Sequence, residues 1–137
     1  MASQPAARWR VLIVDDEPPI RALWEALTTW GYAADVAPDG TAALGRLTEG
    51  CYDLVLTDLA MPGASGWQVV EAVRAQQPAA AVVVMTGSPT RGDGDRARER
   101  GVALLEKPFQ LHELRTVIQE ALATNAPSRP LDRAARR

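Results

Sequence analysis

The sequence predicts a doubly wound α/β domain, in which helices cover both faces of a five-stranded parallel sheet. Short apolar segments alternate five times with segments of helical periodicity, and this alternation is typical of βα units. Two segments are apolar at every position, VLIV and AVVVM, which indicates strands that are covered on both faces. The chain has 137 residues, a length that suits one such domain rather than two.

Five strands are expected, one for each apolar segment. We place them at Arg10 to Val14, Ala33 to Ala37, Asp53 to Thr57, Ala81 to Met85 and Ala103 to Leu105. Parallel neighbours need a crossover between them, and the crossover is right-handed and usually helical. The segments between these strands are therefore the places to look for helices.

Four segments carry apolar residues at helical spacing. We place helices at Pro18 to Trp30, Gly40 to Thr48, Gly66 to Gln76 and Leu111 to Ala123. The first opens with two prolines, which are tolerated in the first turn of a helix. Pro78 ends the third, and the fourth carries leucine or isoleucine at positions 111, 114, 118 and 122.

The segment from Thr90 to Gly101 departs from this pattern. Its sequence is TRGDGDRARERG, with three glycines and with Ala97 as its one apolar side chain. A helix without an apolar stripe has little to pack against a sheet. We therefore expect the fourth of the five helices to be short or mobile.

The composition is that of a globular protein, with 47% hydrophobic and 23% charged residues. The single cysteine, Cys51, excludes an internal disulfide and fits a reducing compartment. The longest apolar run has seven residues, which is too short to cross a membrane, and the first ten residues do not resemble a signal peptide. We expect a cytoplasmic protein with no membrane partner.

Charge is distributed unevenly along the chain. Residues 11–124 contain nine basic and sixteen acidic side chains, whereas residues 125–137 contain four arginines and one aspartate. An acidic domain binds nucleic acid poorly, because affinity for phosphates rests on lysine and arginine. We expect no direct contact with nucleic acid, a flexible N-terminus at 1–8, a folded domain at 9–124 and a flexible basic tail at 125–137.

Polar side chains follow four of the predicted strands, at the edge where open parallel sheets bind their ligands. They are Asp15, Asp16 and Glu17 after the first strand, Asp58 at the end of the third, Thr86, Gly87 and Ser88 after the fourth, and Lys107 after the fifth. Each has an ordinary explanation by itself, as a helix cap, a turn residue or a surface charge. Their meeting at one edge favours a functional site.

In a cluster of carboxylates, either some of them stay protonated through raised pKa values or a cation lies among them. Two carboxylates about 4 Å apart repel each other by about 4 kcal/mol at an effective dielectric constant near 20. An all-oxygen site of this kind suits Mg²⁺ together with phosphate oxygens. One carboxylate could then act as a nucleophile toward a phosphoryl group, with a lysine stabilising the transferring oxygens. Lys107 is the one lysine among fifteen basic residues, and its compact ammonium suits this role better than a guanidinium.

These residues lie in four motifs, VLIVDDE, DLVLTDLAMPGASG, VVVMTG and LLEKPF, which occur in this order. Through them the sequence resembles the receiver domains of bacterial two-component response regulators, the CheY-like family. The resemblance covers about Trp9 to Ala123. It implies a flavodoxin-like fold with the strands in the order 2-1-3-4-5, and a cis peptide bond between Lys107 and Pro108.

The resemblance also implies roles for individual residues. Asp58 is similar to the phosphoacceptor, Thr86 to the switch hydroxyl and Lys107 to the lysine that contacts the phosphoryl group. The implied Mg²⁺ ligands are Asp16, Asp58, the backbone carbonyl of Ala60 and, through water, Asp15. The implied function is a phosphorylation-dependent switch that is loaded by a sensor histidine kinase or a phosphotransfer protein and acts on an unknown downstream protein. The resemblance implies that such a domain is no conventional enzyme. The reactions that it catalyses, its own phosphorylation and a slow autodephosphorylation, act on the domain itself.

Two departures from the family pattern affect the expected switch. Leu104 stands three residues before the lysine, where receivers usually have Tyr or Phe, and a leucine has no ring with a polar tip to reorient. We therefore expect phosphorylation to reshape residues 86–101 more than the fifth strand. Ala60 and Ser88 occupy positions that tune hydrolysis in relatives, and Gly87 leaves the site open. Because Ala60 cannot hold a water with its side chain, we expect no special assistance to dephosphorylation.

Two other side chains bear on the site. His112 is the one histidine of the chain, and we interpret it as a solvated residue of the last helix, so that the donor histidine lies on a partner. Trp67 opens the third predicted helix near the acidic edge, where its fluorescence is expected to report on the site.

Other functions fit less well or stay open. An FMN protein of similar fold needs a phosphate cradle after the first strand, where Asp15, Asp16 and Glu17 would repel it. An enzyme of the haloacid-dehalogenase type needs an acidic residue where Ala60 stands. A receiver-like binding module that works without phosphorylation stays open, as does the receiver portion of a larger regulator or hybrid kinase.

Overall fold

The computed structural model describes residues 8–17, 20–61 and 63–125. Its five parallel strands form one sheet in the order β2-β1-β3-β4-β5, as the resemblance implied. The strands are β1 Arg10–Val14, β2 Ala33–Ala37, β3 Leu54–Asp58, β4 Ala81–Thr86 and β5 Ala103–Glu106. The helices are α1 Ile20–Thr29, α2 Gly40–Glu49, α3 Gly66–Gln76, α4 Arg91–Arg100 and α5 Leu111–Asn125.

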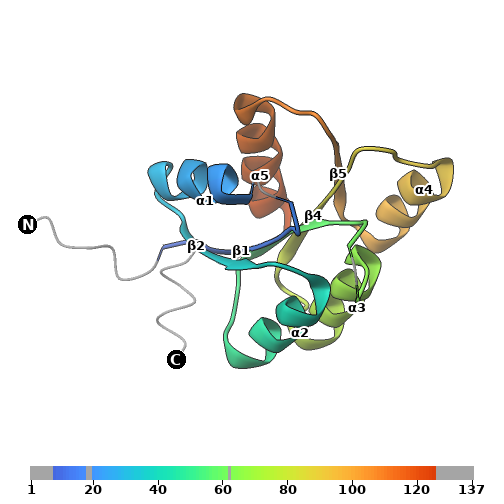
Figure 1. The fold of residues 1–137 in the computed structure, drawn as a ribbon, viewed down its shortest axis with the longest axis horizontal. Coiled ribbons are helices and arrows are strands. Elements are labelled where there is room, and N and C mark those ends of the chain that lie inside the picture. Colours follow the sequence, from blue (N-terminus) through green and yellow to red (C-terminus); the bar gives the residue numbers. More distant parts are fainter. Residues whose placement is uncertain (1–7, 18–19, 62, 126–137) are drawn as a thin grey trace, which may run out of the picture.

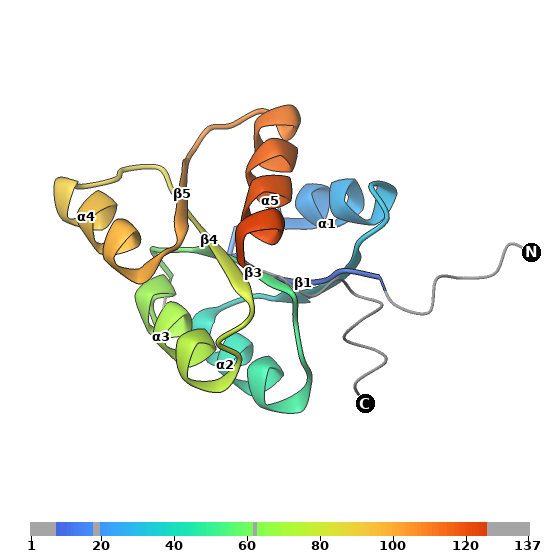
Figure 2. The same ribbon diagram turned by 180° about the vertical axis from the view of Figure 1, so that it is seen from behind.

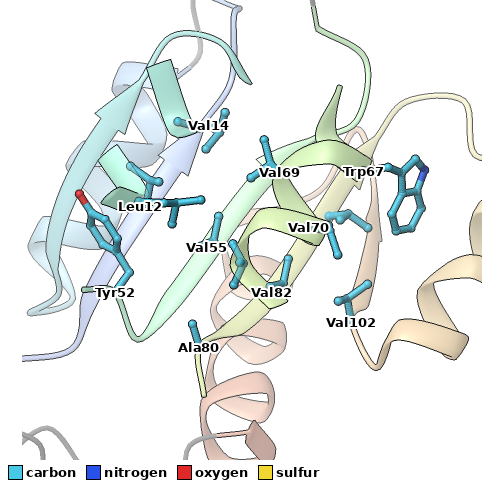
Figure 3. Close-up of a cluster of buried hydrophobic side chains, with 14 of the residues drawn as sticks. Leu12, Val14, Tyr52, Val55, Trp67, Val69, Val70, Ala80, Val82 and Val102 are labelled. Carbon is cyan, nitrogen blue, oxygen red and sulfur yellow. The ribbon is translucent and has the colours of Figure 1, made fainter. Parts of the chain in front are cut away.

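Helices cover both faces of the sheet, with α1 and α5 on one face and α2, α3 and α4 on the other (Figure 1; Figure 2 from behind). Successive side chains of the central strands point to opposite faces, so each strand contributes to two apolar clusters. Leu12 and Val55 belong to the cluster under α2 and α3 (Figure 3), whereas Ile13 and Leu56 belong to the cluster under α1 and α5. This double burial explains why the central strands are apolar at nearly every position.

The predicted elements agree with the structure except at their ends. β3 begins one residue later than predicted and includes Asp58, and α5 ends at Asn125, two residues beyond its predicted end. The peptide bond between Lys107 and Pro108 is cis, as the resemblance implied. Most of the expected flexible segments at 1–8 and 125–137, and the two prolines of the first predicted helix, lie outside the described residues. In the described part of the chain, no helix has the length and apolar character needed to cross a membrane.

The fourth helix, which was expected to be short or mobile, is not short. α4 spans ten residues, as many as α1 and α2. Side chains define its start, because Thr90 and Asp93 form a capping box, and Gly101 ends it in the left-handed conformation at φ 66°. Ala97 is its one buried residue, as the composition indicated. The mobility expected of this helix stays a prediction.

Gly66 allows α3 to lie directly against the end of β3. A Cβ at this position would lie 2.2 Å from the carbonyl oxygen of Asp58 and 2.6 Å from the Cα of Leu59. The absence of a side chain at residue 66 therefore determines how closely α3 approaches the strand end that carries Asp58.

We expect Gly66→Ala to lower the free energy of unfolding by about 1–3 kcal/mol, because the new methyl group meets backbone atoms that cannot rotate away. Gly45→Ala is the matched control, since a Cβ in the middle of α2 meets nothing within 4 Å. It is expected to raise the free energy of unfolding by about 0.5–1 kcal/mol. Urea unfolding measures both, and equal effects of the two substitutions would contradict the packing argument.

Candidate functional site

Three aspartates meet at the carboxyl edge of the sheet. Asp15 directly follows β1 and Asp58 ends β3, and these two strands are neighbours. Asp15 and Asp58 are buried, whereas Asp16 is exposed. One carboxylate oxygen from each of the three lies within 4.8 Å of the other two. The convergence predicted from the sequence is therefore present in the structure.

The ammonium of Lys107 lies among these carboxylates. Its Nζ is 3.1 Å from Oε1 of Glu17, 3.4 Å from Oδ2 of Asp15 and 3.6 Å from Oδ2 of Asp58. The backbone N–H of Lys107 donates to the carbonyl of Thr86 at 2.8 Å, which holds the end of β5 beside the end of β4. The lysine thus connects the last strand to the two strands that carry the buried acids.

Backbone amides orient the buried carboxylates. Oδ1 of Asp15 accepts the N–H of Glu17 at 3.1 Å, and Oδ1 of Asp58 accepts the N–H of Leu59 at 2.9 Å. In each aspartate the other oxygen, Oδ2, is the one nearest to Lys107. The two acids therefore present one oxygen each to the cation.

The protonation of the site follows from burial and neighbouring charge. Burial raises the pKa of Asp58, and the charges of Asp15 and Glu17 raise it further, while Lys107 and the N–H of Leu59 lower it. Burial by itself would lower the pKa of Lys107, but its hydrogen bond to Glu17 and the charges of Asp15 and Asp58 outweigh burial and raise that pKa. Lys107 is therefore charged at neutral pH.

A pocket of about 410 Å³ opens beside Asp58. Its lining residues are Glu17, Asp58, Leu59, Ala60, Trp67, Thr86, Gly87, Ser88, Asp93 and Lys107. Thr86 is buried, and its hydroxyl oxygen accepts the N–H of Ser88 at 3.2 Å. At Gly87 a Cβ would meet a single atom within 4 Å, the Cβ of Lys107 at 4.0 Å, so this side of the pocket is open, as expected.

Four lining residues, Glu17, Leu59, Trp67 and Asp93, lie outside the set of site residues predicted from the sequence, and three of them make polar side-chain contacts. Glu17 pairs with Lys107, and Trp67 and Asp93 form a wall in which the indole Nε1 donates to Oδ1 of Asp93 at 3.3 Å. Trp67 lies beside the acidic edge, as predicted for a fluorescence reporter. Glu17 was part of the polar segment after the first strand, but spacing alone does not show that its side chain reaches Lys107. No sequence signal places the carboxylate of Asp93 in the pocket.

Leu104 and His112 lie away from the pocket. Leu104 is half-buried on β5, where it packs against the apolar cluster of Figure 3 and lines a separate groove between β5 and α5. His112 is exposed on α5, in agreement with its interpretation as a solvated helix residue. Neither side chain lines the pocket beside Asp58.

The donor set fits Mg²⁺. The converging atoms are all carboxylate oxygens, which hard divalent cations prefer. Four carboxylates, those of Asp15, Asp16, Glu17 and Asp58, lie at this edge in the described part of the chain, and three of them contact the ammonium of Lys107. The edge therefore keeps an excess of negative charge, which a divalent cation would neutralise.

An acidic cluster with one lysine at the carboxyl edge of a five-stranded parallel sheet is the arrangement that the resemblance to receiver domains implied. The family model of the response regulator receiver domain matches residues 11–119. The chain therefore belongs to the family of response regulator receiver domains, which act in two-component signalling.

Relatives include regulators and sensor proteins. The transcriptional regulatory protein PcoR from Escherichia coli is 35% identical over 118 residues, which cover 82% of this chain and 52% of PcoR. The virulence sensor protein BvgS from Bordetella pertussis is 34% identical over 143 residues, which cover 97% of this chain and 12% of BvgS. The chain thus spans about half the length of PcoR and a small part of BvgS.

Solved receiver structures have the same fold. The response regulator protein TrrA from Thermotoga maritima, in complex with Mg²⁺-BeF, is 34% identical with a TM-score of 0.72, and the match covers 82% of this chain and 98% of TrrA. The receiver domain of the sensor histidine kinase PA1611 from Pseudomonas aeruginosa has a magnesium ion in its active site cleft. It is 25% identical with a TM-score of 0.76, over 86% of this chain and 100% of that domain.

Ionised Asp58 destabilises the metal-free protein, because burial raises its pKa above the ordinary value of 3.8. This destabilisation is complete above the raised pKa and absent below the ordinary value. We expect Asp58→Asn to raise Tm at neutral pH in the presence of EDTA, and this gain to shrink as the pH falls through the raised pKa. Thermal unfolding at several pH values measures it, with the exposed Asp95→Asn as control. A gain that does not change with pH would contradict the argument.

Proposed function

We propose that this domain is a signalling switch that accepts a phosphoryl group on Asp58 from a histidine kinase or a phosphotransfer protein. The observation that carries the proposal is the buried carboxylate of Asp58, 3.6 Å from the ammonium of Lys107, at the edge where Asp15 and Asp16 converge. Two relatives named as sensor proteins, BvgS and the histidine kinase TmoS, support a partner of this kind.

Asp58 is the nucleophile of the proposed transfer. One of its oxygens forms a bond to phosphorus while the phosphorus–nitrogen bond of a phosphohistidine breaks, and the imidazole nitrogen keeps the electron pair of that bond. Lys107 stabilises the negative charge of the transferring oxygens, since its Nζ already lies beside Asp58. Thr86 borders the same pocket, where its hydroxyl can donate to a phosphoryl oxygen.

A Mg²⁺ ion would be held by Asp16, Asp58 and the backbone carbonyl of Ala60, with Asp15 acting through water. When bound, it supplies positive charge that polarises the phosphoryl oxygens. The convergence of the three carboxylates supports this assignment, as do the magnesium-containing structures of TrrA and of the PA1611 receiver.

The residues around the pocket affect how the phosphorylation signal is transmitted and how dephosphorylation ends it. Ala60 offers no side-chain group to hold a hydrolytic water, so the domain gives no special assistance to dephosphorylation. Leu104 lies outside the pocket and lacks a polar tip, so the proposed rearrangement centres on residues 86–101. The downstream partner is a protein. We assign no DNA contact to this domain, because residues 11–124 are strongly acidic.

Incubation of the full chain with Mg²⁺ and acetyl phosphate is expected to add the mass of one phosphate, which intact-mass spectrometry measures. Asp58→Asn should gain none, because the nucleophile is removed. Asp95→Asn removes an exposed charge on α4 and should be phosphorylated like the wild type. The proposal would be contradicted by a wild-type chain that gains no phosphate mass, or by an Asp58→Asn chain that gains it.

Lys107→Arg is expected to separate phosphorylation from the structural response. A planar guanidinium prefers bidentate geometry and does not reproduce the point charge that meets three carboxylates. The variant should still gain phosphate, while the change in tryptophan fluorescence on phosphorylation is lost. Intact mass and fluorescence measured on the same sample test this, and a wild-type fluorescence change in the variant would contradict it.

A further inference from the structure

α4 is attached to the domain in an unusual way for a helix that covers a sheet. Ala97 is its one buried residue, so the burial of an apolar face contributes little to holding it in place. α3 and α4 lie side by side in both views (Figure 1 and Figure 2). α4 contacts β5, and side chains of α3 add polar contacts to it.

Three side chains on one face of α3 hold α4. They are Trp67, Glu71 and Arg74, whose spacing of four and three residues places them along a single helical stripe. We call these three residues the α3 clamp. Their polar and cation–π contacts with α4 and its C-cap fall at two separate places along α4.

The C-terminal end of α4 is held by charged groups of the clamp. Glu71 pairs with Arg100, and the guanidinium of Arg74 donates to the carbonyls of Arg100 and Gly101 at 3.1 and 3.2 Å. Arg74 also donates to the carbonyl of Ala80 at 3.1 Å, which ties this end of α4 to the start of β4. Three polar contacts thus anchor the C-terminal end of α4, and a fourth fixes Arg74 itself.

The N-terminal end of α4 is held by one side chain of the clamp. The indole Nε1 of Trp67 donates to Asp93 at 3.3 Å, and the guanidinium of Arg96 lies 4.9 Å from the centre of the indole ring. Trp67 is itself buried at one edge of the cluster in Figure 3. A rigid residue of α3 therefore holds the first turns of α4 through one hydrogen bond and one cation–π contact.

This N-terminal contact belongs to the phosphoacceptor pocket. Trp67 and Asp93 line the same pocket as Asp58. Asp93 is ionised at neutral pH, because hydrogen bonds from Thr90 and from Trp67 lower its pKa. Lys107, the one cation that lines this pocket in the described part of the chain, is already shared by three carboxylates. The charge of Arg96 on α4 also acts on Asp93. Negative charge added at Asp58 would repel the Asp93 carboxylate across the same pocket.

We propose that Trp67 and Asp93 form a latch that phosphorylation of Asp58 opens, so that α4 pivots on its anchored C-terminal end. This inference rests on the proposed phosphorylation of Asp58. A phosphoryl group brings further negative charge into a pocket whose wall carries the Asp93 carboxylate, and the repulsion weakens the bond to Trp67. The mechanism gives α4 a way to respond in a chain where Leu104 replaces the usual aromatic residue.

Hydrogen exchange of the full chain, followed by mass spectrometry with and without Mg²⁺ and acetyl phosphate, tests the latch. On phosphorylation the amides of residues 88–96 are expected to exchange about two- to tenfold faster, since one hydrogen bond of modest strength is lost. The amides of residues 97–102 should stay within error of the unphosphorylated protein. Intact mass of the same sample reports whether Asp58 is loaded.

Three variants separate the parts of the mechanism. Trp67→Phe keeps a ring but removes the N–H, so residues 88–96 should exchange faster even without phosphate. Asp93→Asn keeps an oxygen for Trp67 and Thr90 but removes the charge, so the response to phosphorylation should fall by more than half. Asp95→Asn removes the same charge from an exposed site on α4 that pairs with Arg98, and it should keep the full response.

Each outcome bears on the latch. A loaded wild-type chain in which residues 88–96 do not change or become more protected overturns it, and so does an equal increase along all of α4. A Trp67→Phe chain with wild-type exchange at 88–96, or equal responses of the two asparagine variants, overturns it as well. A wild-type chain that gains no phosphate overturns the proposed function, and the latch falls with it.

Discussion

The pairing of Lys107 with buried carboxylates is the interaction on which this structure depends. Asp15 and Asp58 lie side by side out of water, and two like charges in such a place are unfavourable unless a cation joins them. Lys107 brings that cation from the end of β5, which is not a neighbour of β1 or β3 in the sheet. The contact therefore ties three strand ends together at the edge where the chemistry occurs.

The same interaction leaves the edge incompletely neutralised. One ammonium faces the carboxylates of Asp15, Asp16, Asp58 and Glu17, so the site favours a divalent cation and attracts an anion only with a cation in place. The pocket has little free positive charge, because its cation Lys107 is shared by several carboxylates and its wall carries another acid, Asp93. A change of charge at Asp58 is therefore felt by the wall that joins α3 to α4.

Most elements could be predicted because their causes are local. The central strands are apolar on both faces, and α3 starts at Gly66, after the N-cap Ser65, and ends before Pro78 for reasons visible in the sequence. The length of α4 could not be predicted in this way. Its apolar pattern is missing, and the helix is stabilised by a capping box, a left-handed glycine and side chains of α3. A rule based on apolar periodicity does not detect those contacts.

The sequence by itself determined that the strands are parallel and which residues form the acidic cluster, because parallel strands place their carboxyl ends, and the residues that follow them, at one edge. The order of the strands followed from the resemblance to receiver domains. Only the tertiary structure decided which side chains meet across that edge. Glu17 reaches Lys107 over a separation of 90 residues, and Trp67 reaches Asp93 over 26. Such contacts depend on the angle and distance at which packed elements meet, and spacing along a chain does not contain that information.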